Sequence, residues 1–310
     1  MHVLLTVDVE SYTGDYEREV FAEGLGLEFI VRTLKAHGLR ATFFVEALGA
    51  TRWGKAPLER ICRMLDDAGQ DIQLHAHPVV ASIAGFEDRD DVLWKRDIGT
   101  QTMLLETGLR MLGACTEQAL TCFRAGDFAA DVVTLDAMRT VGLSLSSNRD
   151  RDQKCSIRSR INDHFPVRND VSQHAGITDV PVTTVVSPLS RLDGPWRHRE
   201  VSAMGAAEMC CGMRVAQRAG YACTCVLTHP GEFFRWRGGD CVPIRKNMQR
   251  WERLLRFLDA TPGFDVIGID AIGSLPVPRN SPPDICVPAW TSVLRVLEQG
   301  MDRVRVRLRR

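Results

Sequence analysis

"DIQLHAHPVV", residues 71–80, combines a strand pattern with two closely spaced histidines. Ile72 and Leu74 alternate with polar residues, which is the period of a β-strand, and this strand leads directly into His75 and His77. Residues two apart in a strand point to the same side, so both imidazoles are able to reach one metal ion. An ordinary polar strand end gives the same local pattern. The residues at the other predicted strand ends are needed to choose between these two interpretations.

Similar strand patterns alternate with helical patterns along the whole chain. We expect strands at 2–8, 41–47, 71–77, 119–128, 143–148, 176–185, 221–229 and 264–270. Helical patterns are predicted at 16–37, 56–69, 91–109, 129–142, 202–220 and 248–261. This alternation is typical of a parallel sheet with helical crossovers. Seven or eight such units over 310 residues favour a closed or nearly closed barrel over an open doubly wound sheet.

The domain organisation follows from where this alternation stops. We predict one catalytic barrel over residues 1–275 and a C-terminal extension over residues 276–310 that packs on the barrel. The extension ends in the basic tail "DRVRVRLRR", residues 302–310. A polar, irregular stretch at 149–176 is expected to lie as a loop over one end of the sheet, where loops often line sites.

Composition and charge exclude several classes of function. Hydrophobic residues make up 45% and charged residues 25% of the chain, which is ordinary for a globular protein. The 39 Lys and Arg residues balance the 39 Asp and Glu residues, so the protein has no net positive charge that would favour binding to nucleic acid. The first strand pattern is not a secretory signal, and no apolar run is long enough to cross a bilayer. We therefore expect a cytoplasmic protein.

Two minor features complete this interpretation of the composition. In a reducing compartment, the ten cysteines are expected to be small buried side chains and not disulfides. The basic tail is expected to be a solvated terminus, with a weak contact to an anionic membrane surface or a phosphorylated substrate as the alternative.

Charged and ligating side chains follow several of the predicted strands. Asp8 and Glu10 end the first strand, Arg124 lies on the fourth, and His229 ends a later one. In a parallel barrel, the carboxyl ends of the strands carry the chemistry. Two histidines with a carboxylate suit a divalent ion such as zinc. The other carboxylate is then a candidate general base, the arginine orients it, and the third histidine is a candidate general acid. Asp8 and Glu10 share one face of the strand, so their two roles stay open at this point.

Five stretches in this order resemble the motifs of the polysaccharide deacetylase family, also called carbohydrate esterase family four or the nodulation-deacetylase homology domain. The resemblance covers residue 1 to about residue 272. It implies a distorted (β/α)7-type barrel with parallel strands and a divalent metal ion, usually zinc. The stretches are TVDVE (6–10), LHAHP (74–78), FRAGDF (123–128), TDVPV (178–182) and VLTHPGEF (226–233).

The resemblance also assigns roles to residues. It implies Asp8 as the general base, His229 as the general acid and Arg124 as the residue that orients Asp8. Asp179, in the fourth motif, would pair with His229. The implied metal ligands are Glu10, His75 and His77.

The chain departs from the family pattern in three places. The family's second histidine would fall at Val79, so His77 is the available substitute. The family's two adjacent acidic residues are here separated by Val9. The third motif lacks its proline and aromatic residue, and Gly126 and Asp127 stand in those places.

The activity implied by the resemblance is that of a metal-dependent deacetylase or amidohydrolase acting on non-peptide carbon–nitrogen bonds. We expect it to remove an N-acyl group, with acetyl as the first choice, from an amino sugar or sugar conjugate in surface polysaccharide biosynthesis. A nucleotide-linked or lipid-linked glycan is the expected partner. The alternatives are another C–N bond (formyl, ureido or allantoin-like) and a glycan-binding pseudo-enzyme without turnover.

Overall fold

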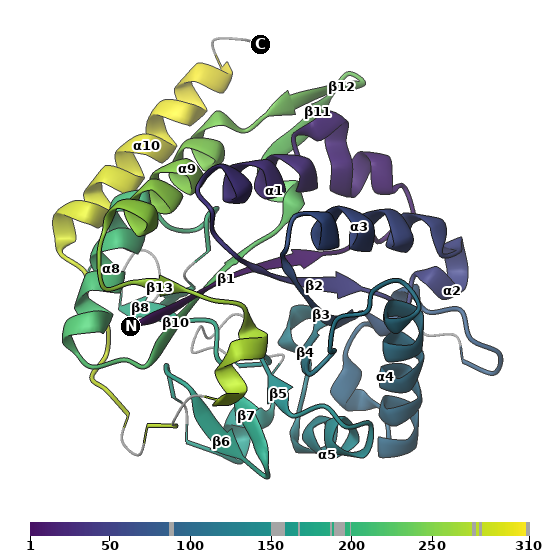
Figure 1. The fold of residues 1–310 in the computed structure, drawn as a ribbon. Helices are drawn as coiled ribbons and strands as arrows, with labels where there is room; N and C mark the ends of the chain where they lie inside the picture. Colours follow the sequence, from purple (N-terminus) through teal and green to yellow (C-terminus); the bar gives the residue numbers. More distant parts are fainter. Residues whose placement is uncertain are drawn as a thin grey trace.

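Strand β1 (His2–Val9) is an inner strand of a mostly parallel sheet in the computed structural model of the chain (Figure 1). It pairs in parallel with β10 (Cys223–Thr228) on one side and with β2 (Thr42–Glu46) on the other. The short strand β13 (Asp265–Val266) pairs with the beginning of β1. The first strand of the chain therefore joins its two halves.

The sheet curls into a distorted barrel that is open on one side. From β2 it continues through β3 (Asp71–Ala76), β4 (Cys122–Ala125), β5 (Leu145–Ser146) and β7 (Ile177–Asp179), and the antiparallel strand β6 (Ser172–His174) ends it. Residues 180–183 lie between β7 and β10 along the chain, and they connect the two sides of the opening through isolated backbone hydrogen bonds. The Val180 N–H donates to the Ser146 carbonyl at 2.8 Å, and the Thr183 N–H donates to the Cys225 carbonyl at 3.1 Å. The predicted fold class, a distorted barrel of parallel strands, is confirmed.

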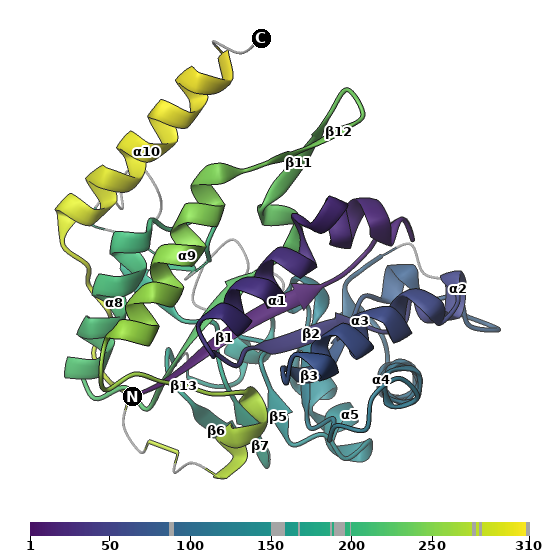
Figure 2. The same ribbon diagram turned by 45° about the horizontal axis from the view of Figure 1, so that its top comes forward.

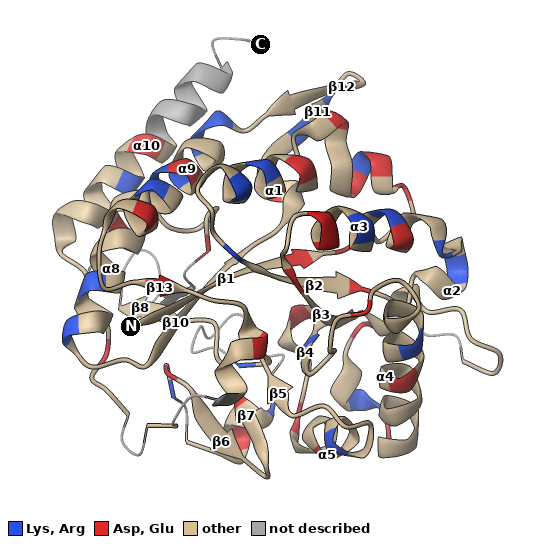
Figure 3. Ribbon diagram, in the orientation of Figure 1, with Lys and Arg blue, Asp and Glu red and all other residues tan. Residues whose placement is uncertain are grey.

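Helices surround this sheet in both views (Figures 1 and 2). The structure describes residues 1–86, 90–149, 159–166, 168–186, 188, 196–198, 200–274, 277–278 and 281–307. Both signs of charge are interspersed along α1, α3 and α9, because these helices bury one face and expose the other (Figure 3). The α-helices are α1 (Leu27–Ala36), α2 (Ala50–Trp53), α3 (Ala56–Asp67), α4 (Ile98–Gly113), α5 (Val132–Thr140), α8 (Ala206–Arg218), α9 (Arg245–Ala260) and α10 (Ala289–Arg307).

Each strand has one face towards the surrounding helices and one face towards the barrel interior. The polar residues of the site lie on the interior face. On β1, Val3, Leu5 and Val7 belong to the large core between the sheet and the helices. Leu4 belongs to a smaller core inside the barrel, and Thr6 and Asp8 follow it on the same side because side chains alternate along a strand. The barrel interior is therefore apolar at one end and polar at the carboxyl ends of the strands.

Several predicted elements differ in extent from the observed ones. The helix expected at 16–37 is interrupted: a π-helical turn, η1 (Glu17–Phe21), and a 3-10 turn, η2 (Ala22–Gly24), precede α1. A side chain at Gly26 would lie 2.0 Å from the Val20 carbonyl oxygen, so the chain must bend there. The strand expected at 176–185 is split into β7 and β8 (Thr184–Val186), and β8 pairs with β9 (Trp196–His198) outside the main sheet.

The C-terminal helix α10 packs on α8 through buried polar groups. The Arg295 guanidinium lies 3.0 Å from the Glu208 carboxylate, and Arg250 of α9 pairs with Glu298 at 3.1 Å. The division of the chain at residues 275 and 276 stays a prediction. Residues 308–310 of the basic tail, and residues 150–158 of the predicted irregular loop, lie outside the described residues. Among the described helices, none is both long and apolar enough to traverse a bilayer.

A buried polar cluster near β6 makes stability depend on pH. His174 is buried, with Nε2 2.6 Å from a guanidinium nitrogen of Arg149 and 2.9 Å from the Ser172 hydroxyl. Burial, reinforced by the Arg149 charge, lowers the pKa of His174 to about 4. The folded protein therefore keeps His174 neutral at pH values where the unfolded chain protonates it.

We expect the wild type to lose folding free energy as the pH falls from about 6.5, the unfolded pKa of histidine, towards about 4. His174→Gln cannot take up the proton, so its stability should fall less over the same range. The expected difference is about 1–3 kcal/mol. Urea denaturation of both proteins at pH 7.5 and pH 5 measures it. Parallel curves for the two proteins would show that His174 is not the responsible group.

Candidate active site

His75 and His77 point into the barrel from the end of β3. His75 is the fifth residue of the strand, and His77 follows it with φ −114° and ψ 110°, which is still extended. The proline at position 78 favours this conformation, because its ring disfavours a helical residue before it. Both histidines are about 1% exposed. Pro78 therefore keeps the two imidazoles on the same side of the chain.

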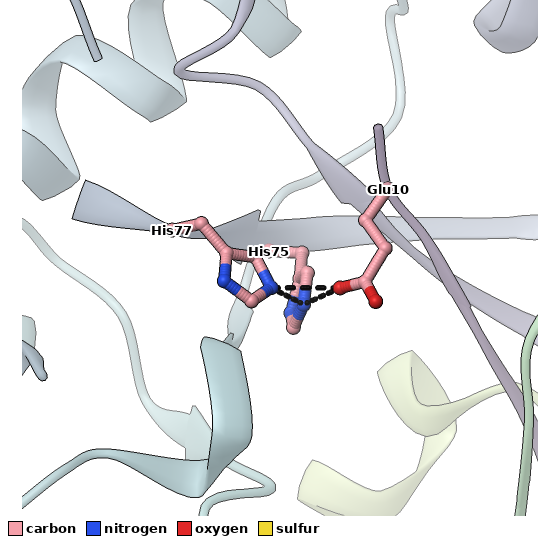
Figure 4. A group of neighbouring side chains, drawn as sticks. All are labelled: Glu10, His75 and His77. Atoms are coloured by element: carbon pink, nitrogen blue, oxygen red, sulfur yellow. Dashed lines mark hydrogen bonds and ion pairs between the residues drawn. The ribbon is translucent and has the colours of Figure 1, made fainter. Parts of the chain in front are cut away.

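Glu10, at the end of β1, meets both imidazoles (Figure 4). Its Oε2 atom lies 3.1 Å from His75 Nε2 and 2.7 Å from His77 Nε2, and the two nitrogens are 3.1 Å apart. Ligand atoms around a tetrahedral zinc ion with bonds of about 2.0–2.1 Å are about 3.3 Å apart. These three side chains have ligand atoms close enough together to hold one ion.

The other nitrogen of each ring fixes where the protons are. His75 Nδ1 is 2.8 Å from the Arg124 backbone oxygen, which only accepts, so Nδ1 carries a proton. His77 Nδ1 contacts the Asp91 carboxylate in the same way. The two Nε2 atoms and a Glu10 carboxylate oxygen therefore converge on one point, where a proton or a metal ion would lie between them. Two imidazoles with one carboxylate are a donor set for a divalent first-row ion.

The charges around these groups favour a cation as well. Burial alone would raise the pKa of Glu10, but hydrogen bonds from the two histidines hold this pKa well below its usual value. Burial would lower the pKa of His77, yet Asp91 and Glu10 raise it well above the usual value. The pocket between the three side chains therefore stabilises positive charge.

Asp91 was not found from the sequence. Besides contacting His77, its other oxygen accepts the Val79 backbone N–H at 3.3 Å. Val79, where the family pattern places a histidine, thus contributes a backbone group, and part of its side chain packs against the core. Asp91 lies 14 residues after His77, and no local sequence pattern around it predicts a contact with His77.

Gly126 leaves the space that the His77 ring occupies. A Cβ atom at this position would lie 2.2 Å from both Cε1 and Nδ1 of His77. The departure at Gly126 and the shift of the second histidine from position 79 to position 77 are therefore coupled in space. Asp127, the other departure in this motif, is exposed and has a positive φ of 52°.

Asp8 lies beside this centre and is held by Arg124. An Arg124 amino group donates to Asp8 Oδ1 at 2.5 Å and to the Thr6 hydroxyl at 3.1 Å. The second amino group donates to the Ser147 hydroxyl at 2.8 Å, so the two amino groups bind different residues and the guanidinium is not bidentate on Asp8. Arg124 is fully buried, and its guanidinium lies 4.0 Å from the Phe44 ring centre.

His229 faces Asp8 from the end of β10. Its Nε2 atom is 3.9 Å from Asp8 Oδ2, and its Nδ1 is 3.0 Å from the Glu232 carboxylate. Glu232 also accepts the His229 backbone N–H at 3.1 Å and the Ser202 backbone N–H at 2.9 Å, which fixes its position. Against the effect of burial, Glu232 and then Asp8 raise the pKa of His229 to about 10.

Asp179, the expected partner of His229, contacts other residues in the structure. Asp179 is buried at the end of β7, where it accepts the Ser146 hydroxyl at 2.8 Å and lies 3.6 Å from Arg149. Glu232 holds the position expected for Asp179. The signal for Glu232 was its place three residues after His229, within one turn of the chain.

A cleft of about 450 Å³ opens in front of these residues. Glu10 and His229 line it on the side of the candidate metal centre, and Phe234 and Trp236 of strand β11 (Phe234–Arg237) line it on another side. A second group of possible ligands, Glu200, His229 and Glu232, lies near its wall. We favour the first group for the ion, because His229 Nδ1 already donates to Glu232.

We expect Gly126→Ala to weaken zinc binding by about ten- to a hundredfold, the usual effect of disturbing the surroundings of a ligand. The added methyl group would displace the His77 ring, which cannot move away without leaving Asp91 and Glu10. Competition with a fluorescent chelator measures the affinity. Gly113→Ala is the control, since its Cβ would meet one atom at 3.9 Å. Equal zinc affinity in wild type and Gly126→Ala would contradict this geometry.

Comparisons with known proteins show which solved structures have a similar fold. No family model and no curated protein matches the sequence. A protein from Mycobacterium smegmatis, described as a candidate polysaccharide deacetylase, has a TM-score of 0.58 and 16% identity, over 91% of this chain and 94% of that one. A family 4 carbohydrate esterase from Streptomyces lividans in complex with acetate has a TM-score of 0.44 and 12% identity, over 86% and 91% of the two chains.

A further match shows that structural similarity to this chain extends to a protein with a different activity. A 4-alpha-glucanotransferase from Thermococcus litoralis has a TM-score of 0.53 and 11% identity, over 93% of this chain and 42% of that one. Different activities therefore occur on this architecture, and the reaction has to be argued from the site. The resemblance to the polysaccharide deacetylases is confirmed at the level of the fold: the chain has the fold of that family.

Proposed function

We propose that this protein is a metal-dependent hydrolase that removes an N-acyl group, acetyl as the first choice, from an amino sugar or sugar conjugate. The observation that carries this proposal is the convergence of three possible ligand atoms within 2.7–3.1 Å of one another at the side of a cleft. Asp8 and His229 lie beside them, which supplies the acid and base that amide hydrolysis needs.

Glu10, His75 and His77 would hold the ion. A divalent ion there supplies positive charge that polarises a carbonyl group and lowers the pKa of water. Zinc is the proposed ion because two imidazoles and one carboxylate suit it. Glu10 contacts the histidine pair and Asp8 contacts Arg124, which supports Glu10 as the ligand and Asp8 as the base.

The remaining residues would move the protons. Asp8, oriented by Arg124, accepts a proton from the attacking water as the new C–O bond forms. His229 is kept protonated by Glu232 and gives its Nε2 proton to the leaving nitrogen as the C–N bond breaks. The products are a carboxylic acid and an amine, and a proton transfer from Asp8 to His229 restores both groups.

Hydrolysis of amino-sugar derivatives tests the proposal. We expect release of acetate from N-acetylated sugars by the zinc-loaded protein, loss of activity with a chelator, and loss of both zinc and activity in His77→Ala. His37→Ala is the matched control, because His37 lies on the surface and pairs with Asp259 at 2.9 Å. Parallel assays for formate and ammonia cover formyl and ureido substrates. Stoichiometric zinc without turnover on any of these would favour the pseudo-enzyme.

The pH profile gives a separate test of the acid. Glu232→Gln keeps a hydrogen-bond acceptor for His229 but removes the negative charge that raises the His229 pKa to about 10. Since an acid must be protonated to act, we expect the alkaline limb of kcat/KM to move down by about one to two pH units. Thermal unfolding of the variant checks that the fold is kept. An alkaline limb at the wild-type pH would assign the acid role to another group.

Two further expectations from the sequence stay predictions. One is a role in surface polysaccharide biosynthesis with a nucleotide-linked or lipid-linked glycan as the substrate. The other is the cytoplasmic location.

A further inference from the structure

We propose that Arg18, stacked on Trp236 in the cleft, binds a phosphate or diphosphate group of the substrate. This inference rests on the proposed function and narrows its substrate to a phosphorylated N-acylated sugar. It starts from a cation at the cleft that no acidic side chain neutralises.

The carboxylates that flank Arg18 along the chain are engaged elsewhere. Asp15 accepts the backbone N–H of Arg18 at 3.1 Å, and Glu17 forms an ion pair with Arg60. Glu19 accepts the backbone N–H groups of Tyr12 at 2.9 Å and Thr13 at 3.2 Å, and hydroxyl groups of the same loop. Within the described part of the chain, the Arg18 guanidinium has no ion-pair partner.

Trp236 holds this guanidinium in a defined place. The Arg18 Cζ atom lies 4.9 Å from the Trp236 ring centre, and the indole N–H donates to the Arg18 backbone oxygen at 3.0 Å. In both ribbon views, the segment that carries Arg18 lies beside the hairpin of β11 and β12 (Asp240–Pro243) (Figures 1 and 2). Stacking uses the face of a guanidinium and leaves the N–H groups at its edge available to grip two oxygens of a phosphate.

The same cleft contains the reacting groups. Arg18 and Trp236 line it together with Glu10 and His229. Its volume of about 450 Å³ lies in the usual range for small-molecule sites. One ligand is therefore able to place an N-acyl group at the candidate metal centre and an anion at Arg18. Sugars linked to a nucleoside diphosphate or to a lipid diphosphate share this chemistry.

Calorimetric binding to the 310-residue protein tests the subsite. The probes are N-acetylglucosamine 1-phosphate and neutral N-acetylglucosamine. We expect the phosphorylated sugar to bind about ten- to a hundredfold more tightly, the range for charge-assisted hydrogen bonds to one guanidinium. Arg18→Gln should abolish this preference, and Arg18→Lys should keep part of it. Arg32→Gln is the matched control, because Arg32 lies 5.8 Å from the Phe29 ring centre and does not line the cleft.

The outcomes separate this inference from the proposed function. Equal affinity for both sugars in the wild type, or a preference that survives Arg18→Gln, overturns the phosphate subsite even if hydrolysis is observed. A preference that disappears only in the Arg18 variants supports the subsite, even if no N-acyl group is hydrolysed. Parallel titrations with a nucleoside-diphosphate sugar and with a lipid-diphosphate sugar in detergent show which source of the diphosphate the cleft prefers.

Discussion

Arg124 is a fully buried charge inside the barrel, and the polar half of the structure depends on satisfying it. Its side chain bonds to Asp8 and Thr6 of β1 and to Ser147 after β5, while its backbone oxygen accepts from His75 of β3. A buried guanidinium that lost these partners would be strongly destabilising. Four strands are therefore held in one arrangement by one residue, and that arrangement also places the candidate base and one candidate ligand.

The departures from the family pattern compensate one another in space. Position 79 lacks a histidine, but His77 is held in an extended conformation by Pro78 and reaches the same centre as His75. Gly126 provides the room for its ring. Substituting any one of these positions alone would leave a missing ligand or a steric clash. The changes at positions 79 and 126 therefore fit the position of His77 in space.

The orienting carboxylates show the same kind of replacement. Asp91 fixes the proton of His77 on Nδ1, and Glu232 fixes the proton of His229 on its own Nδ1. In each case a carboxylate turns the opposite nitrogen, Nε2, towards the centre of the site. The Nε2 atom of His77 faces Glu10 at 2.7 Å, and the Nε2 atom of His229 faces Asp8 at 3.9 Å. The two histidines thus share one kind of support and differ in the group that their Nε2 atoms meet.

The amino-acid pattern alone is enough to predict which strand ends carry ligating and charged residues. Strand periodicity places His75 and His77 on one side, and the rule that chemistry gathers at the carboxyl ends of parallel strands joined Asp8, Arg124 and His229. These inferences succeed because they depend on local geometry and on an architecture that the alternation of elements reveals. The interruption of the helix before α1 was missed because its cause, the close approach of Gly26 to the Val20 carbonyl, is a contact made by the folded chain.

The residues that support the site became evident from the folded chain. It replaced Asp179 with Glu232 as the partner of His229, and it brought Asp91 to His77 and Arg18 to Trp236. Asp91 and Arg18 lie on segments outside the strands, whose paths no periodic pattern fixes. Their positions depend on the course of the connecting segments at the open end of the barrel. Packing and hydrogen bonding among segments far apart in the sequence set that course.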